Sequence, residues 1–159
     1  MAQARYTFAP LRMRDARAMA SWRYDGEYAF YDTDLFPLIF IAALRRVLSA
    51  LGIEAFAVRD DDGKLVGTFS FTREGDSVEI GLAMRPDLTG RGLGLGFVRS
   101  GMAFARQRYA PRTFTLDVAT FNQRAITVYT RAGFMPLHTF QRRTKQGSVE
   151  FLEMTCPAS

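Results

Sequence analysis

The sequence has 159 residues, of which 48% are hydrophobic and 23% charged. That balance suits one globular domain with a real core and argues against a disordered or fibrous protein. The longest apolar run, residues 35–44, is too short to span a membrane, which takes roughly 20 residues. The start of the chain has no apolar signal segment, and the single cysteine, Cys156, cannot form an internal disulfide. We therefore expect one domain over residues 1–159, located in the reducing cytoplasm and without a membrane partner.

The net charge of +5 favours a polyanionic partner, but only weakly. Basic residues gather at 106–108 and 141–145 and form no long basic stripe. Nucleic acid is therefore not the expected partner, whereas a phosphate-rich cofactor would satisfy the same charge.

The first third of the chain predicts one strand and two helices. The strand is expected at residues 6–11, and the helices at 14–22 and 34–51. Asp34 can cap the second helix, and Gly52 ends it. The stretch from Trp22 to Asp34 is aromatic and acidic without a clean period, which predicts a structured loop.

From residue 54 onward the pattern is typical of a sheet. Strands are expected at 55–58, 65–72, 78–84, 113–118, 134–141 and 149–155, and helices at 94–109 and 122–132. The short turns predict antiparallel hairpins, whereas the helical crossover at 94–109 predicts a parallel pair of strands. The result is a mixed α/β (α+β) domain with one largely antiparallel sheet and helices on both faces. Its expected order is β-α-α-β-β-β-α-β-α-β-β.

The glycine cluster from Thr89 to Gly96 joins the end of a strand to the start of a helix. Glycines allow positive φ and close approach to a ligand, and the first helical turn offers unpaired N–H groups, so the cluster predicts a pyrophosphate cradle. A dinucleotide fingerprint needs glycines at i, i+2 and i+5, and the cluster has no such trio. A P-loop is excluded because Met102 stands where lysine is required. The remaining alternative is a glycine-rich turn that binds no ligand. Its glycines would destabilise the start of the helix without serving a binding site.

Residues 83–94 and 122–134 together resemble the GNAT superfamily of N-acetyltransferases. The layout is similar to that of the bacterial ribosomal-protein and small-amine acetyltransferases. The resemblance implies the GNAT fold and acetyl-CoA as cosubstrate without a metal. It also implies direct acetyl transfer in a ternary complex to a primary amine of a small molecule or protein, and it allows a homodimer. The cofactor-binding residues that it implies are Leu82, Ala83, Met84, Gly90, Arg91, Gly92, Leu93, Gly94, Leu95 and Asn122.

The pyrophosphate loop fits the family pattern in two registers. Arg91 in the first position matches the usual letters, whereas Thr89 in the first position keeps the usual distance from Pro86. We prefer Thr89, because the distance from the strand fixes where the phosphates lie.

Asn122 and Tyr129 are seven residues apart and lie on one face of the expected helix. The resemblance places Asn122 near the pantetheine arm and Tyr129 near the CoA sulfur as general acid. A thiol has an unperturbed pKa of roughly 8.5, so a phenol within hydrogen-bond reach can protonate the leaving thiolate. The simpler interpretations are a helix cap for Asn122 and a core aromatic for Tyr129.

Two strand carboxylates, Glu79 and Asp117, are candidates for the base that deprotonates the acceptor amine. Asp117 has the shorter side chain and would need a bridging water. If Met84 lines the cofactor, strict alternation places Glu79 on the opposite face unless the strand has a bulge. Either carboxylate could instead bond to the backbone or pair with an arginine.

The aromatic stretch lies where the family builds its acceptor pocket. The residues expected to bind the acceptor are Trp22, Tyr24, Tyr28 and Tyr31, whose rings could hold a cation. The alternative is an aromatic loop packed on the core. His138 is expected to be structural, since nothing near it in sequence suggests a metal site. The alternative function is a CoA-binding sensor or regulatory domain without catalysis.

Overall fold

A computed structural model describes residues 5–159, and residues 1–4 lie outside the described part of the chain. One seven-stranded sheet runs through the molecule in the order β1-β2-β3-β4-β5-β7-β6. Its strands are β1 (Thr7–Pro10), β2 (Ile53–Arg59), β3 (Leu65–Glu74), β4 (Ser77–Met84), β5 (Thr113–Ala119), β6 (Met135–Thr144) and β7 (Gly147–Pro157). Only β4 and β5 pair in parallel, and every other neighbouring pair is antiparallel. The predicted mixed, largely antiparallel sheet is confirmed.

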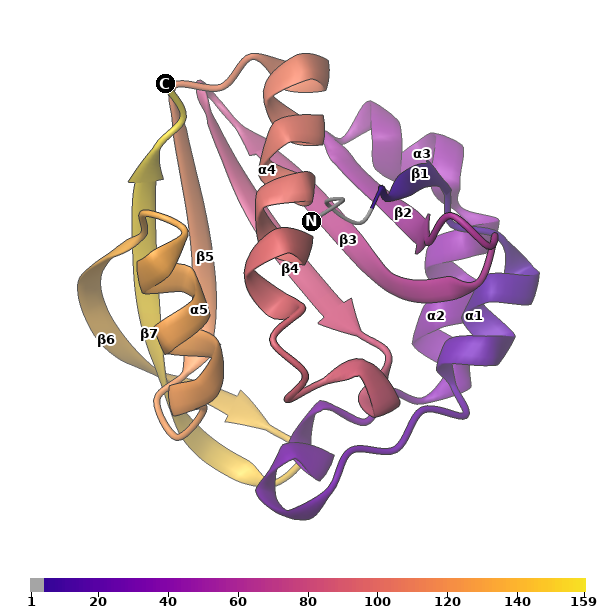
Figure 1. The fold of residues 1–159 in the computed structure, drawn as a ribbon, viewed down its shortest axis with the longest axis horizontal. Coiled ribbons are helices and arrows are strands. Elements are labelled where there is room, and N and C mark those ends of the chain that lie inside the picture. The colour runs from indigo at the N-terminus through magenta and orange to yellow at the C-terminus, as the bar shows by residue number, and fades with distance from the viewer. Residues whose placement is uncertain (1–4) are drawn as a thin grey trace.

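Helices cover both faces of this sheet, as predicted (Figure 1). The long helix α4 (Gly94–Tyr109) and α5 (Gln123–Arg131) lie on one face. On the other face, α1 (Met13–Met19), α2 (Leu35–Ala43) and α3 (Arg45–Ala50) lie at the end of the sheet formed by β1 and β2. Two short 3₁₀ helices, η1 (Gly26–Tyr31) and η2 (Pro86–Leu88), interrupt the loops. No helix in the described part of the chain has the length and apolarity to cross a bilayer.

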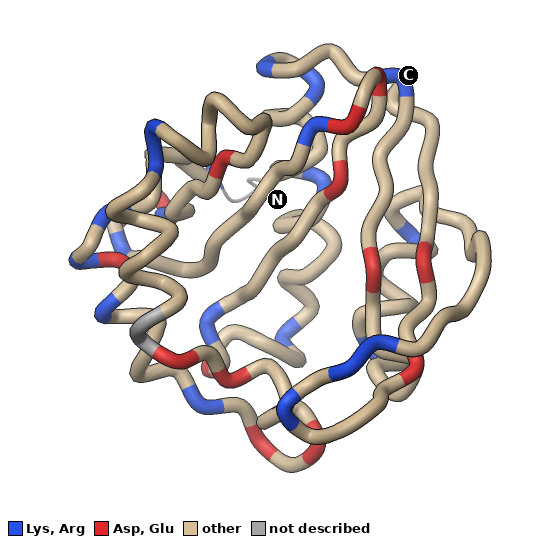
Figure 2. The backbone as a smooth tube through the Cα atoms, turned by 180° about the vertical axis from the view of Figure 1, so that it is seen from behind, with Lys and Arg blue, Asp and Glu red and all other residues tan. Residues whose placement is uncertain are grey.

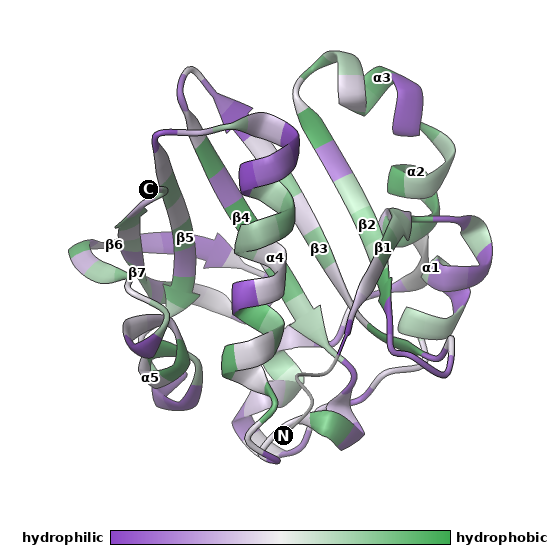
Figure 3. Ribbon diagram, turned by 45° about the horizontal axis from the view of Figure 1, so that its top comes forward, coloured by the Kyte–Doolittle hydropathy of each residue, from purple (hydrophilic) through white to green (hydrophobic). Residues whose placement is uncertain are grey.

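The alternation of side chains along the strands divides the core in two. On β2, Phe56 and Val58 join the larger cluster beneath α4, while Ala57 between them joins the smaller cluster beneath α1 and α2. The same alternation is visible as bands of opposite hydropathy along β4 (Figure 3). Burial of apolar surface on both faces of the central strands therefore fixes their register.

Helix α4 packs on a side chain of β3 through a glycine, Gly101. A Cβ atom at Gly101 would overlap the ring of Phe69, which is completely buried. Gly96 is in the same helix, but a Cβ atom there would meet nothing within 4 Å.

We therefore expect opposite effects from the same substitution at these two glycines. Gly101→Ala should lower the free energy of unfolding by about 1–3 kcal/mol through overpacking. Gly96→Ala should raise it by about 0.5–1 kcal/mol, because alanine loses less backbone entropy in a helix. Urea denaturation of both variants measures the difference. Equal stabilities would contradict the close packing of α4 on β3.

Three details of the predicted elements are wrong. The helix expected at 34–51 is two helices that meet at Leu44, because α2 packs against α1 whereas α3 packs against β2. Asp34 precedes α2 as predicted, but its side chain makes no cap and instead accepts a hydrogen bond from Lys145. The first helix ends at Met19, short of Trp22, and the loop that follows contains η1.

Candidate functional site

Strands β4 and β5 are paired along only part of their length. Their parallel pairing runs from Ser77 opposite Thr113 to Glu79 opposite Thr115 and then stops. Beyond that point β4 stays paired with β3 and β5 stays paired with β7, so the two strands diverge (Figure 1). The opening between residues 80–84 and 116–119 is called the gap below, and Glu79 lies where it begins.

The glycine loop lies beyond the end of β4, at the start of α4. Gly90 and Gly92 have φ of +73° and +77°, and a Cβ atom at Gly92 would meet nothing within 4 Å. Leu93 provides no side-chain cap, so the amides of the first helical turn are open to a ligand. The guanidinium of Arg124 on α5 comes within 3.8 Å of the Cβ position of Gly90. These features fit a pyrophosphate site: the amides are open, the space beside Gly92 is free of side chains, and a cation lies nearby.

Asn122 is the cap of α5, as predicted, and it also bonds across to the loop before α2. Its Oδ1 accepts a hydrogen bond from the Ala125 amide at 3.1 Å, and its Nδ2 donates to the Tyr31 hydroxyl at 3.1 Å. Tyr129 follows two turns later and is half-buried, with its ring edge-on to Phe134. Burial first, and then the nearby Tyr31, raise the pKa of Tyr129 above its ordinary value, so this hydroxyl keeps its proton at neutral pH.

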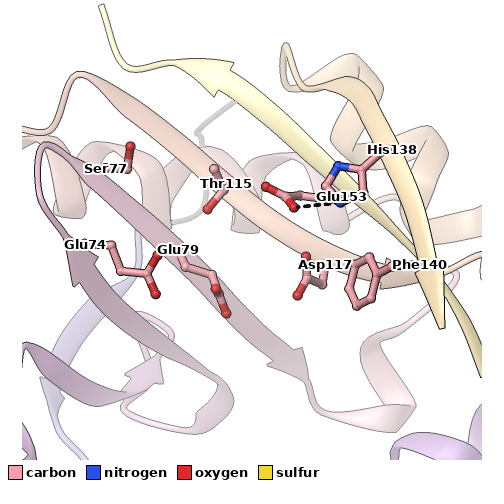
Figure 4. Close-up of a pocket in the computed structure, with 8 residues that line it drawn as sticks. All are labelled: Glu74, Ser77, Glu79, Thr115, Asp117, His138, Phe140 and Glu153. Atoms are coloured by element: carbon pink, nitrogen blue, oxygen red, sulfur yellow. Dashed lines mark ion pairs between the residues drawn. The ribbon is translucent and has the colours of Figure 1, made fainter. Parts of the chain in front are cut away.

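A groove of about 470 Å³ lies on the face of the sheet opposite α4 (Figure 4). It is lined by Glu74, Ser77, Glu79, Thr115, Asp117, His138, Phe140 and Glu153. Figure 2 shows acidic positions on neighbouring strands of this face. Strand β4 pairs with β3 without a bulge, so Glu79 and Met84 point to opposite faces, as strict alternation predicts.

The two candidate bases differ in their partners. Asp117 accepts a hydrogen bond from Arg142 at 2.6 Å, and its side chain is 17% exposed. The same guanidinium lies 4.5 Å from the ring centre of Phe151, which fixes the pair against an apolar surface. Among residues 5–159, Glu79 has no hydrogen-bonding or ion-pair partner. Glu79 is solvent-exposed at the groove, and partial desolvation by the neighbouring strands, and then the charges of Asp117 and Glu74, raise its pKa above its ordinary value.

The aromatic loop residues lie at the open end of the gap and do not line the groove. The Tyr24 hydroxyl donates to the Met84 carbonyl at 2.7 Å, and the guanidinium of Arg124 lies 4.3 Å from the ring centre of Tyr28. Trp22 packs against the smaller core cluster. The expected role of Trp22, Tyr24, Tyr28 and Tyr31 in acceptor binding stays a prediction.

The glycine loop and Asn122 lie around the gap, and the predicted carboxylates Glu79 and Asp117 line the groove. Two residues that the sequence did not assign to the site lie beside them. His138, expected to be structural, lines the groove with its Nε2 3.6 Å from a carboxylate oxygen of Glu153. Arg124 could have been noticed only by its place two residues after Asn122. Within the described residues, no group of three or more His, Cys, Asp or Glu side chains is placed to hold a metal ion.

Comparisons with known proteins identify relatives of the fold. The model of the acetyltransferase (GNAT) family matches residues 15–134, whereas a search of curated protein sequences gave no match. The spermidine N-acetyltransferase from Vibrio cholerae in complex with CoA and spermine has 15% identity and a TM-score of 0.79, with 96% of this chain and 95% of that chain covered. A chimera of the Vibrio cholerae enzyme and hSSAT has 16% identity and a TM-score of 0.80, with 99% and 96% covered. The dodecameric Vibrio cholerae enzyme in an intermediate state has 17% identity and a TM-score of 0.75, with 97% and 94% covered.

Proposed function

Because the chain belongs to the GNAT acetyltransferase family, we propose that it transfers the acetyl group of acetyl-CoA to a small cationic amine bound in the acidic groove. One observation carries the proposal. Glu79, a carboxylate with a raised pKa and no ionic partner among the described residues, lies where β4 and β5 separate and faces the groove. In this proposal Glu79 would be the base, lying between the gap, which would take the pantetheine arm, and the groove, which would take the amine.

The cofactor side rests on the glycine loop and the gap. The amides of residues 90–95 would hold the pyrophosphate, with Arg91 and Arg124 supplying positive charge. Leu82, Ala83 and Met84 would line the pantetheine arm on one side of the gap, and Asn122 would approach it from the other. The thioester supplies the activated acetyl group. We keep the register that begins at Thr89, because its first glycine is then Gly92, which has a positive φ and open space around it, and its second is Gly94, the first residue of α4.

Glu79 is the better candidate for the base. An ammonium group with a pKa near 10 must lose a proton before its nitrogen can attack, and a carboxylate with a raised pKa accepts that proton more readily. Asp117 is already paired with Arg142, and breaking that pair would leave a charge partly buried. Asp117 would therefore act on Glu79 through its charge, while it remains paired with Arg142.

Tyr129 is the proposed general acid. Its hydroxyl is protonated at neutral pH, as a donor to a leaving thiolate must be, and its raised pKa means that it would act mainly by donating a hydrogen bond to the sulfur as charge develops there. Its position on α5, two turns after Asn122, places it on the side of the gap opposite β4.

The groove favours an acceptor with more than one positive charge. Carboxylates from β3, β4, β5 and β7 meet there. Asp117 is neutralised by Arg142, whereas Glu74 and Glu79 have no ion-pair partner among the described residues, so their negative fields add in a partly enclosed space. Solved structures of the same fold include a spermidine N-acetyltransferase bound to CoA and spermine, which supports a polyamine as the first acceptor to test. The experiment is a turnover assay with acetyl-CoA on spermidine, spermine and single-amine compounds. Binding of CoA without turnover on any amine would favour a non-catalytic CoA sensor instead.

The cofactor site can be tested by binding alone. Gly92→Val should weaken CoA binding well over tenfold in calorimetry, because valine is strained at φ +77° and fills the space of the cradle. Gly63→Val is the matched control, since Gly63 has the same φ of +77° with open space around it, in the β2–β3 turn. The control should lose similar stability and keep its CoA affinity. Normal CoA binding by folded Gly92→Val would show that the phosphate site lies elsewhere.

A further inference from the structure

The loop between α1 and α2 forms a closed unit of its own. The Tyr24 amide donates to Asp32 Oδ1 at 2.9 Å, which ties together the two ends of the segment 24–32. Within the segment, the 3₁₀ helix η1 packs the Phe30 ring edge-on to Tyr31. The segment is therefore a compact loop with fixed ends.

One end of the segment 24–32 contacts β4. The Tyr24 hydroxyl donates to the carbonyl of Met84, the last residue of that strand, at 2.7 Å. Burial and the charge of Asp32 raise the pKa of Tyr24 to about 12, so the hydroxyl remains a donor throughout the neutral range. The amide of the next residue, Arg85, donates a hydrogen bond to the carbonyl of Val66 on β3. The end of β4 is therefore bonded both to the segment 24–32 and to β3.

The other end contacts the far side of the gap. The Tyr31 hydroxyl accepts from Asn122, whose amide is oriented by its cap to α5. Phe30 packs edge-on to Phe121, with ring centres 5.5 Å apart, in the turn between β5 and α5. In Figure 1 this segment crosses below the lower ends of β4 and the strands beside it.

We propose that the segment 24–32 is a brace that sets the width of the gap, with Tyr24 and Tyr31 as positioning residues for the cofactor. The sheet itself does not fix that width, because the pairing of β4 and β5 stops at Glu79 and Thr115, well before Met84. The brace bonds to the end of β4 and to the cap of α5, and so joins the two sides that diverge. The inference rests on the proposed function only for the identity of the ligand.

The test compares Tyr24→Phe, Tyr31→Phe and the double variant. Each keeps its ring and loses one hydroxyl. In the ligand-free protein, amide hydrogen exchange over 80–84 and 116–119 should become faster in both single variants. CoA affinity should fall about tenfold in each, since a gap of fixed width is preorganised for its ligand. A brace released at one end no longer sets the width of the gap, so releasing the other end should have no further effect. The CoA affinity of the double variant should therefore also fall about tenfold, and not the roughly hundredfold expected from two independent contacts.

Tyr109→Phe is the matched control. It also removes one partly buried hydrogen bond, from the Tyr109 hydroxyl to Glu54, but at the opposite end of α4 from the glycine loop. It should keep its CoA affinity and its exchange rates in the gap. Unchanged exchange in Tyr24→Phe and Tyr31→Phe, or losses of affinity that multiply, would overturn the brace and leave the proposed function standing. A parent protein that binds no CoA would overturn the proposed function, and with it any role of the brace toward that cofactor.

Discussion

Glu79→Gln should lower kcat/KM for acetyl transfer to spermidine by roughly 10²–10⁴, the usual range for a positioned base. Glutamine keeps the size of the side chain, so the groove should keep its shape. The raised pKa means that the folded protein holds the ionised carboxylate at a cost, and its stability falls as the pH rises through that pKa. At pH 7 the variant should therefore be at least as stable as the parent, and thermal unfolding checks that the lost activity is not lost structure.

The pH profile separates Glu79 from Asp117 as the base. A base works when deprotonated, so kcat/KM should fall as the pH drops through the raised pKa of Glu79, at a higher pH than for an ordinary glutamate. Asp117→Asn removes a neighbouring negative charge and leaves Arg142 unneutralised, and both changes lower the pKa of Glu79. The acidic limb of the profile should then move to lower pH with activity retained. Loss of activity in Asp117→Asn, with a modest effect of Glu79→Gln, would reverse the assignment.

The sequence predicts most of the fold because its local signals agree with one another. Helix 94–109 has the predicted bounds, since glycines precede it and its apolar face meets the sheet. The parallel pairing of β4 with β5 follows from that helical crossover. Where local signals conflict with packing, packing decides. At Leu44 the single helix expected at 34–51 divides into α2, which packs against α1, and α3, which packs against β2.

The groove could be predicted only in part, because it depends on the order of the strands. Glu74 and Glu153 come from opposite halves of the chain and line one groove only because β5 lies between β4 and β7. The ion pair of Arg142 with Asp117 has the same origin, since it joins β6 to β5 across β7. The bonds of Tyr24 and Tyr31 depend on the path of a loop without periodicity, so the sequence indicated their ring chemistry and not their partners.

Tyr129→Phe should lower kcat by roughly 10²–10⁴ and leave CoA affinity almost unchanged. The substitution keeps the ring that packs against Phe134, so folding should be affected little. The hydroxyl matters only when the carbon–sulfur bond breaks and the sulfur takes up charge, and an interaction made mainly in the transition state changes kcat and not ground-state binding.

The dependence on the leaving group makes this prediction specific to proton donation. Burial disfavours the tyrosinate form of Tyr129, so the hydroxyl stays protonated and can donate a hydrogen bond to the departing thiolate as negative charge develops on the sulfur. An acetyl thioester of a more acidic thiol gives a weaker base, which needs less protonation. The ratio of parent to variant kcat should therefore shrink with such a donor, and a purely structural role of the hydroxyl would leave that ratio constant. Equal kcat values for parent and variant with acetyl-CoA and spermidine would show that the thiolate leaves without this proton, or that water provides it.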